Sequence, residues 1–163
     1  MDNELNIHMD ISNSVAQVTD TESLGMSLMV CSEAESGLLA AMNKELIEDE
    51  QSDNQMTENQ LKERMEGFLR GSYHAYLLKA GDDVVGYALC DMAKTPIYLR
   101  QFFIKREFRR RGYGEKAVTL LMKELHARHL DIEVYVWNQR GIAFWKSCGF
   151  RERSIYMRHT KQE

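Results

Sequence analysis

The pattern of hydrophobic and polar positions predicts one strand followed by two helices in the segment that begins at residue 24. Residues 24–31 alternate weakly between apolar and polar and are bounded by polar residues, which predicts a strand. Ser32 with Glu35, and Thr57 with Gln60, have the spacing of capping boxes and so predict two helix starts. An apolar stripe at helical spacing supports the first helix and consists of Leu38, Leu39, Met42, Leu46 and Ile47.

The pattern then changes to the alternation that is typical of strands. Residues 73–80 and 83–92 are two such runs, and the Gly81-Asp82 pair between them predicts a hairpin. Residues 96–108 form a longer predicted strand. The remaining expected elements are a helix from Gly112, a strand over 131–137, a helix over 138–149 and a strand over 150–160. The order β-α-α-β-β-β-α-β-α-β predicts an α/β fold with a mixed central sheet.

The length of 163 residues suits one domain with one core. We expect residues 23–163 to form this domain and residues 1–22 to be a partly disordered N-terminal extension. No apolar run approaches the roughly 18 residues that span a bilayer, and the N-terminus lacks the layout of a signal peptide. The three cysteines and five histidines show no metal-ligand spacing, so we expect reduced thiols, no metal and a cytoplasmic protein.

Charge is distributed unevenly along the chain, although the net charge is only −4. Residues 1–60 hold 13 acidic residues and 1 basic residue, which gives a charge of −12. Residues 61–163 hold 12 acidic and 20 basic residues, which gives +8. So acidic a first third argues against a nucleic-acid partner. The distribution suits a protein that binds an anionic cofactor at one end and a cationic substrate at the other.

A cluster of basic residues surrounds two glycines in the segment "IKREFRRRGYGEKAV", residues 104–118. The order strand, loop, helix allows backbone N–H groups of the first helical turn to bind an anion, and Gly112 and Gly114 remove side chains that would block its approach. Three arginines add positive charge beside them: Arg109, Arg110 and Arg111. The spacing fits neither a Walker loop nor the dinucleotide fingerprint. Alone, it leaves open a phosphate cradle or a capped basic surface.

In context, this segment resembles the GNAT superfamily of acyl-CoA N-acyltransferases. The resemblance runs from about residue 24 to the C-terminus. Its specific parts are Arg109-x-x-Gly112-x-Gly114 after a strand, and Asn138 followed by Phe144-Trp145 and Gly149-Phe150. The acidic "ELIEDE" near residue 48 also looks like one bacterial branch of the superfamily. The resemblance implies a mixed sheet in which two central strands splay apart, with acetyl-CoA as cosubstrate.

The same resemblance implies where acetyl-CoA would bind. The pantetheine arm would lie between the strands at 98–108 and 131–138, where backbone groups of Phe102, Phe103 and Ile104 would bind it. Phe103 is assigned the catalytic contact, because a fixed N–H stabilises the oxyanion that forms on the thioester carbonyl. The pyrophosphate would be bound by the segment Arg110, Arg111, Gly112, Tyr113, Gly114 and Glu115. Asn138, Phe144 and Trp145 would line the cofactor channel.

The implied reaction is direct attack by a primary amine of a small, cationic acceptor within a ternary complex. An alkyl amine with a pKa near 10.4 is mostly protonated at pH 7, so its free base costs roughly 4–5 kcal/mol and a general base is needed. Glu48 and Glu50, at the acidic end of the first helix, are the candidates for base or acceptor ligand. An acidic helix C-terminus is unfavourable for the helix dipole, which favours a functional reason for these residues.

One position departs from the family pattern. Many relatives have tyrosine where this chain has Trp145, and an indole N–H cannot protonate a leaving thiolate near neutral pH. Either water or a group such as Ser147 or Cys148 assists, or the acid role is absent. The alternative function is therefore a non-catalytic acyl-CoA-binding regulatory module. No membrane or nucleic-acid partner is expected, whereas the last predicted strand could pair in a homodimer.

Overall fold

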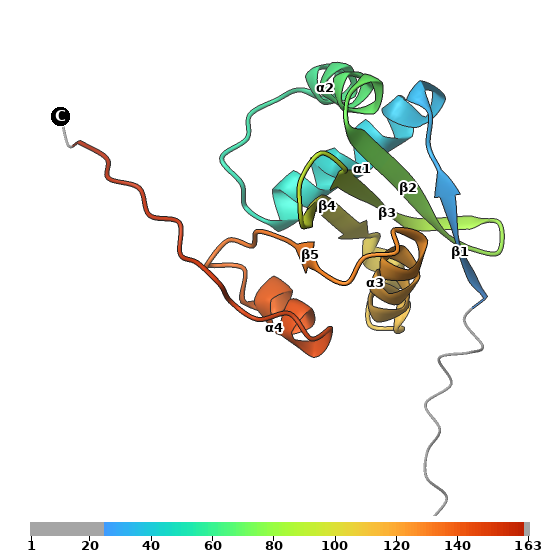
Figure 1. The fold of residues 1–163 in the computed structure, drawn as a ribbon. Helices are drawn as coiled ribbons and strands as arrows, with labels where there is room; N and C mark the ends of the chain where they lie inside the picture. The colour runs from blue at the N-terminus through green and yellow to red at the C-terminus, as the bar shows by residue number, and fades with distance from the viewer. Residues whose placement is uncertain (1–24, 162–163) are drawn as a thin grey trace, which may run out of the picture.

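The computed structural model describes residues 25–161 and contains one five-stranded sheet between two layers of helices (Figure 1). The strands are β1 (Met26–Val30), β2 (Tyr73–Ala80), β3 (Asp83–Asp91), β4 (Ile97–Ile104) and β5 (Leu130–Asp131). The helices are α1 (Ser36–Asp49), α2 (Glu58–Arg70), α3 (Tyr113–Glu124) and α4 (Gln139–Ser147), with short 3-10 turns η1 (Glu33–Glu35) and η2 (Arg106–Phe108). The extension predicted at residues 1–22 lies outside the described residues.

Local signals in the sequence account for most element boundaries. Both capping boxes are confirmed, although that of Ser32 opens η1, which leads directly into α1. The box of Thr57 and Gln60 opens α2. The hairpin is also confirmed, because only Gly81 and the residue after it separate β2 from β3, and Gly81 has a φ of 60°.

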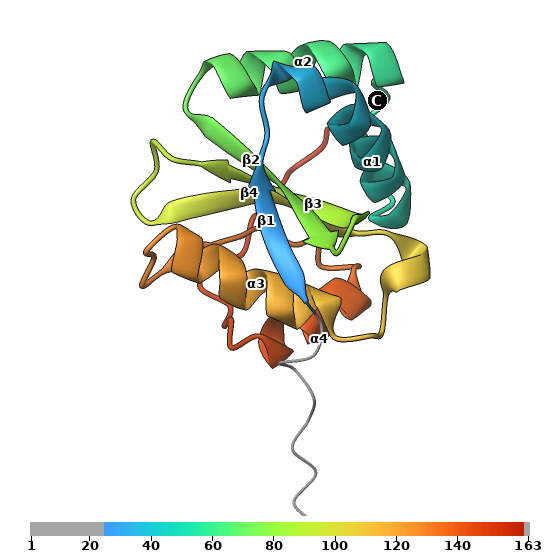
Figure 2. The same ribbon diagram turned by 90° about the vertical axis from the view of Figure 1, so that its right-hand side faces the viewer.

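The sheet order is β1-β2-β3-β4-β5, antiparallel from β1 to β4 and parallel between β4 and β5. Helices α1 and α2 cover one face, and α3 and α4 lie on the other (Figure 2). The central strand β3 is buried from Val85 to Asp91. Gly86 is required there, because an added Cβ would lie 1.9 Å from the carbonyl oxygen of Phe103 on β4. The mixed α/β fold predicted from the sequence is confirmed.

A β-bulge in β4 changes which side chains face α1 and α2. Leu99 pairs with Cys90 and Gln101 pairs with Leu89, so Arg100 has no partner on β3. Leu99 packs in the core beneath α3, whereas the side chains of Arg100 and Gln101 both contact residues of the α1 and α2 layer. The bulge therefore places two consecutive polar side chains on one face of the sheet.

The last part of the chain differs from its prediction. The strand expected over 131–137 is only the two-residue β5, which pairs with Ile97 and Tyr98 before the two strands separate. No strand forms over residues 151–161, which run away from the body (Figure 1). The side chains at 155–157 are 80–85% exposed. A strand needs a neighbouring edge that supplies hydrogen bonds, and no strand among the described residues pairs with this segment.

Within the described part of the chain, no helix is long and apolar enough to cross a membrane.

Candidate functional site

The first component of the site is the loop that joins β4 to α3. Gly112 has a φ of 82° in the left-handed region and occupies the N-cap of α3. The first backbone bond of this helix runs from the Lys116 N–H to the Gly112 carbonyl, so the N–H groups at 113–115 have no helical partner. Arg110 and Arg111 are exposed beside them. The loop thus presents free N–H groups, positive charge and the positive end of a helix dipole together.

Arg109 differs from its two neighbours, because its guanidinium points back into the protein. It pairs with Asp49, donates from Nε to the Ile104 carbonyl at 2.7 Å and lies 5.4 Å from the centre of the Phe103 ring. Arg106 binds the same carboxylate at 2.8 Å. Arg109 therefore fastens the loop to the end of α1, and sequence reasoning passed over Asp49 as its partner.

Asp49 is accordingly ionised. Burial would raise its pKa, but hydrogen bonds and charge from Arg109 and Arg106 outweigh burial and hold the pKa below its usual range. Glu48, the first candidate base, lies on the exposed side and approaches Arg106 only at 3.8 Å.

The second component is the open edge of β4. Beyond Tyr98, no strand within residues 25–161 pairs with this edge. The Lys105 N–H donates to the Val85 carbonyl of β3 at 2.8 Å, and N–H directions alternate along a strand. The register therefore turns the N–H groups of Phe102 and Ile104 toward the open edge and that of Phe103 toward β3. Phe103 is 2% exposed and contributes its ring to the core.

An aromatic cluster lies below this edge. Trp145 packs against Phe102, Phe144 and Phe150 at centroid distances of 5.3, 4.9 and 5.0 Å. A Cβ at Gly114 would lie 2.8 Å from the Phe144 ring, so this glycine permits close packing of α3 on α4. Sequence reasoning had given Gly114 to the cofactor alone.

Two further loop residues have internal partners. Tyr113 packs edge-on against Phe108, at a centroid distance of 5.9 Å. The Glu115 carboxylate lies 3.1 Å from the Ser147 hydroxyl, whose one proton it shares with the Phe144 carbonyl at 2.7 Å.

The third component is a hollow of about 300 Å³ between the end of α1 and the start of α4. It is lined by Asp49, Glu50, Gln51, Trp137, Asn138, Gln139 and Arg140. It brings together two residues that sequence reasoning selected, Glu50 and Asn138. Asn138 is also the N-cap of α4, since its side-chain oxygen accepts from the Gly141 N–H at 2.9 Å.

Glu50 has the electrostatics of a candidate base. Burial, and then the charge of Asp49, raise the pKa of its carboxyl to about 6. Its backbone carbonyl accepts the indole N–H of Trp137 at 2.9 Å, which ties the end of α1 to the segment before α4. Trp137 was missed as a site residue because it was expected inside a strand. Its exposure, 55%, is the structural signal that identifies it.

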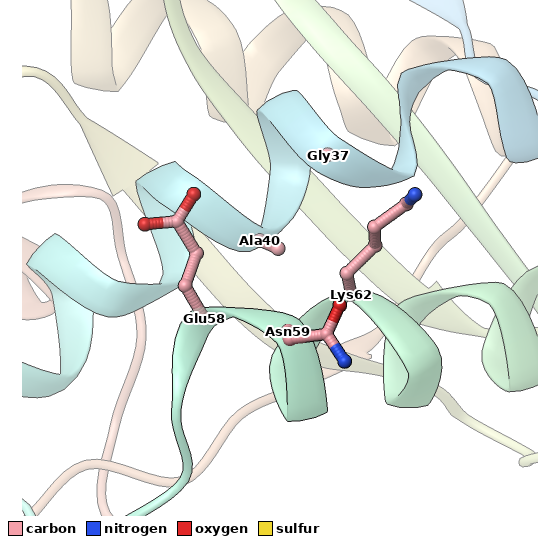
Figure 3. Close-up of a pocket in the computed structure, with 5 residues that line it drawn as sticks. All are labelled: Gly37, Ala40, Glu58, Asn59 and Lys62. Atoms are coloured by element: carbon pink, nitrogen blue, oxygen red, sulfur yellow. The ribbon is translucent and has the colours of Figure 1, made fainter.

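A second hollow, of about 230 Å³, lies between α1 and α2 and is lined by Gly37, Ala40, Glu58, Asn59 and Lys62 (Figure 3). Its polar side chains come only from α2, and none of them was selected from the sequence. Among residues 25–161, no group of three or more His, Cys, Asp or Glu side chains could hold a metal ion.

Comparison with known proteins gives consistent matches in family and fold. Residues 39–150 match the family model described as the acetyltransferase (GNAT) family. An acetyltransferase from Thermus thermophilus superposes with a TM-score of 0.65 at 21% identity, covering 78% of this chain and 88% of that one. The aminoglycoside acetyltransferase AAC(6')-Iy superposes with a TM-score of 0.64 at 15% identity, covering 84% of this chain and 98% of that one.

The aminoglycoside acetyltransferase meta-AAC0020, from an uncultured soil metagenomic sample, gives a TM-score of 0.62 at 11% identity, covering 85% and 97%. No curated protein matches the sequence.

Proposed function

Because the chain belongs to the GNAT acetyltransferase family, we propose that it transfers an acetyl group from acetyl-CoA to a primary amine of a small acceptor. The observation that carries the proposal is the junction at Asp49. Through Arg106 and Arg109, this carboxylate holds the N–H-rich loop before α3 next to the hollow that contains Glu50. A site for a phosphate-bearing cosubstrate and a candidate base thus share one anchor.

The residues present fit acetyl-CoA. The left-handed Gly112 and the free N–H groups at 113–115 suit a pyrophosphate, and the open edge of β4 suits the pantetheine amides. One structural neighbour, AAC(6')-Iy, is described in complex with CoA. Bound acetyl-CoA would supply the acetyl group, and its thiol would be released.

In our proposal, Glu50 removes the proton from the acceptor amine, directly or through water. With a pKa of about 6, its carboxylate is mostly ionised at pH 7 yet more basic than an ordinary glutamate. The amine nitrogen then bonds to the acetyl carbon, and the carbon–sulfur bond breaks with the electron pair leaving on sulfur. The nitrogen loses its second proton through water to the thiolate, so that the amide and the free thiol form. We assign the oxyanion contact to the N–H of Phe102 or Ile104 rather than Phe103, because only the former two face the open edge.

We propose no protein acid for the leaving thiolate. Trp145 is enclosed by aromatic rings, and the Ser147 hydroxyl lies 2.7 Å from the Phe144 carbonyl as a donor. Burial raises the pKa of Cys148. A thiol with a pKa near 8.5 is a tolerable leaving group without assistance.

Thiol release from acetyl-CoA, measured with a panel of small amines from pH 5 to 9, tests this function. We expect amine-dependent release whose kcat/KM rises as pH passes about 6, since Glu50 must lose its proton to act as base. Glu50→Gln should lower kcat by about 10²-fold and abolish the rise of kcat/KM near pH 6. The Glu48→Gln control should leave both unchanged. Acetyl-CoA binding without thiol release for any amine would instead support the acyl-CoA-binding module.

The acceptor proposed here is cationic at its amine end. The carboxylate of Glu50, which lines the hollow, favours a positive charge, and two structural neighbours are named as aminoglycoside acetyltransferases.

We also propose that two copies pair through the segment 151–161, called here the C-terminal arm. The arm carries apolar side chains that are 80–85% exposed, and the stretch that follows β5 carries exposed Val136 and Trp137. Pairing of one copy's arm with the other's open stretch would bury both. Sedimentation should therefore give a dimer, and a version ending at residue 150 should be monomeric. A monomeric full-length chain would contradict the proposal.

A further inference from the structure

Two guanidinium groups share one aromatic residue on the α1 and α2 face of the sheet. The central carbon of Arg100 lies 5.0 Å from the centre of the Phe68 ring, and that of Arg64 lies 5.7 Å from the same centre. Arg100 also lies 6.0 Å from the Tyr73 ring. Arg100 is directed there by the bulge in β4, whereas Arg64 comes from the middle of α2.

In the part of the chain that the structure describes, these two cations have no carboxylate partner. Within residues 25–161, neither Arg64 nor Arg100 takes part in an ion pair. Burial, and then the charge of Arg100, lower the pKa of Arg64. The Nε of Arg64 is buried and has no hydrogen-bond partner. Arg100 is exposed and its charge is solvated by water, whereas the half-buried Arg64 is solvated less. Two positive charges beside one ring would attract an anionic ligand.

The polar groups around the pair offer donors and few acceptors. Arg64 donates to the side-chain oxygen of Asn43 at 3.0 Å, and Gln101 donates weakly to the same oxygen at 3.4 Å. The Gln101 oxygen already accepts the Tyr87 hydroxyl at 3.0 Å. The remaining N–H groups of Arg64 and Arg100 are therefore available to an oxygen ligand from outside the chain.

The pair and the candidate base can be placed along α1. Arg64 binds Asn43, and Glu50 follows Asn43 by seven residues, which is about two helical turns or roughly 10 Å along the same helix face. Tyr98, two residues before Arg100, has a pKa raised to about 12, chiefly by burial, and both Glu50 and Arg100 act on it. Glu50 likewise acts on Tyr87, whose hydroxyl contacts Gln101. One small molecule could thus contact a carboxylate at one end and two guanidinium groups at the other.

We propose that Arg64 and Arg100 bind a carboxylate of the acceptor, so that the substrate is a small amine that also carries a carboxylate, as an amino acid does. This inference rests on the proposed acetyltransferase function. A guanidinium is a planar fork that pairs with a carboxylate through two parallel bonds; a phosphate can pair in the same way, so the test below includes a phosphate arm. The flat rings of Phe68 and Tyr73 would flank that plane.

Calorimetric binding in the presence of saturating CoA, which allows no turnover, tests the inference. The probes are L-lysine and two analogues of it, L-lysine methyl ester and 1,5-diaminopentane. Both analogues keep the side-chain amine but lack the carboxylate charge. We expect L-lysine to bind about tenfold more tightly than either analogue, as charge-assisted hydrogen bonds predict. Arg100→Gln should reduce this preference to about twofold or less. Lys62→Gln, on the far side of α2, should keep it.

A second variant guards against loss of fold. Arg64→Gln alters a half-buried residue, so its circular dichroism is compared with wild type before binding is measured. Equal binding of L-lysine and 1,5-diaminopentane to the wild type would overturn the inference. So would a preference that survives both arginine substitutions. A parallel comparison of O-phosphoethanolamine with ethanolamine tests for phosphate binding. If the protein prefers the phosphorylated amine but shows no preference for L-lysine over its analogues, the carboxylate assignment is overturned.

Failure of the inference can be told apart from failure of the proposed function. Carboxylate-dependent binding that requires Arg100, without thiol release with any amine, would support the carboxylate site and contradict the acetyltransferase function. Equal turnover of L-lysine and 1,5-diaminopentane would support the acetyltransferase function and contradict the carboxylate site.

Discussion

Two pairs of arginines differ in how their charge is compensated. Arg106 and Arg109 share the carboxylate of Asp49, whereas Arg64 and Arg100 share only a phenylalanine ring and no carboxylate of the described chain. The first pair is compensated within the fold and fastens a loop. The second is uncompensated, which is how a site for an anionic ligand differs from a structural ion pair.

Removing the carboxylate that Arg106 and Arg109 share should have the largest effect on stability. Asp49→Asn would leave Arg106 and Arg109 without their anion and should lower the free energy of unfolding by about 2 kcal/mol at pH 7. Urea unfolding measures this change. Because the pKa of Asp49 is held below its usual range, its stabilising effect is complete at neutral pH. The effect fades as the pH falls below about 4, through the lowered pKa.

The control for this change is Glu48→Gln, one residue away, with a side chain that is 58% exposed. Its effect on unfolding should be within about 0.5 kcal/mol. If both variants unfold alike, Asp49 does not anchor the loop and the first pair is not compensated in the way proposed.

Giving the second pair an internal carboxylate should have a smaller effect. Gln101→Glu would place a carboxylate beside the Arg64 and Arg100 guanidinium groups, since Gln101 and Arg64 already share one oxygen of Asn43. The variant should bind L-lysine and 1,5-diaminopentane within about twofold of each other. Calorimetry with CoA present measures this ratio. An unchanged preference for L-lysine would mean that the carboxylate binds elsewhere.

The loop that carries the first pair could be predicted from the sequence, whereas neither pairing of the arginines could, for a physical reason. The loop before α3 depends on signals a few residues apart, a strand end, Gly112 and a helix start, so its form could be predicted locally. The grouping of Arg64 with Arg100 depends on the packing of α2 on the sheet and on a bulge opposite Cys90 and Leu89. No local pattern in the sequence indicates where that bulge falls.

The same reasoning explains the errors near the C-terminus. Residues 132–137 and 151–160 alternate as strands do, yet they form none, because strand formation depends on a partner edge as well as on the pattern. Conversely, the Gly81 turn, the Ser32 box and the Thr57 box are local and were all predicted. Glu50 was selected from the acidic run, whereas Asp49 and Trp137 acquire their contacts only through tertiary packing.

The central claim is that the loop before α3 binds acetyl-CoA, and calorimetric titration with a matched pair of variants tests it most directly. Gly112→Asn and Gly112→Asp are nearly isosteric and both tolerate a φ of 82°, so they differ mainly in charge. We predict micromolar binding by the wild type, a modest loss with Asn and a further loss of about tenfold or more with Asp, because a carboxylate would repel the pyrophosphate. No binding by the wild type, or equal binding by the two variants, would contradict the account.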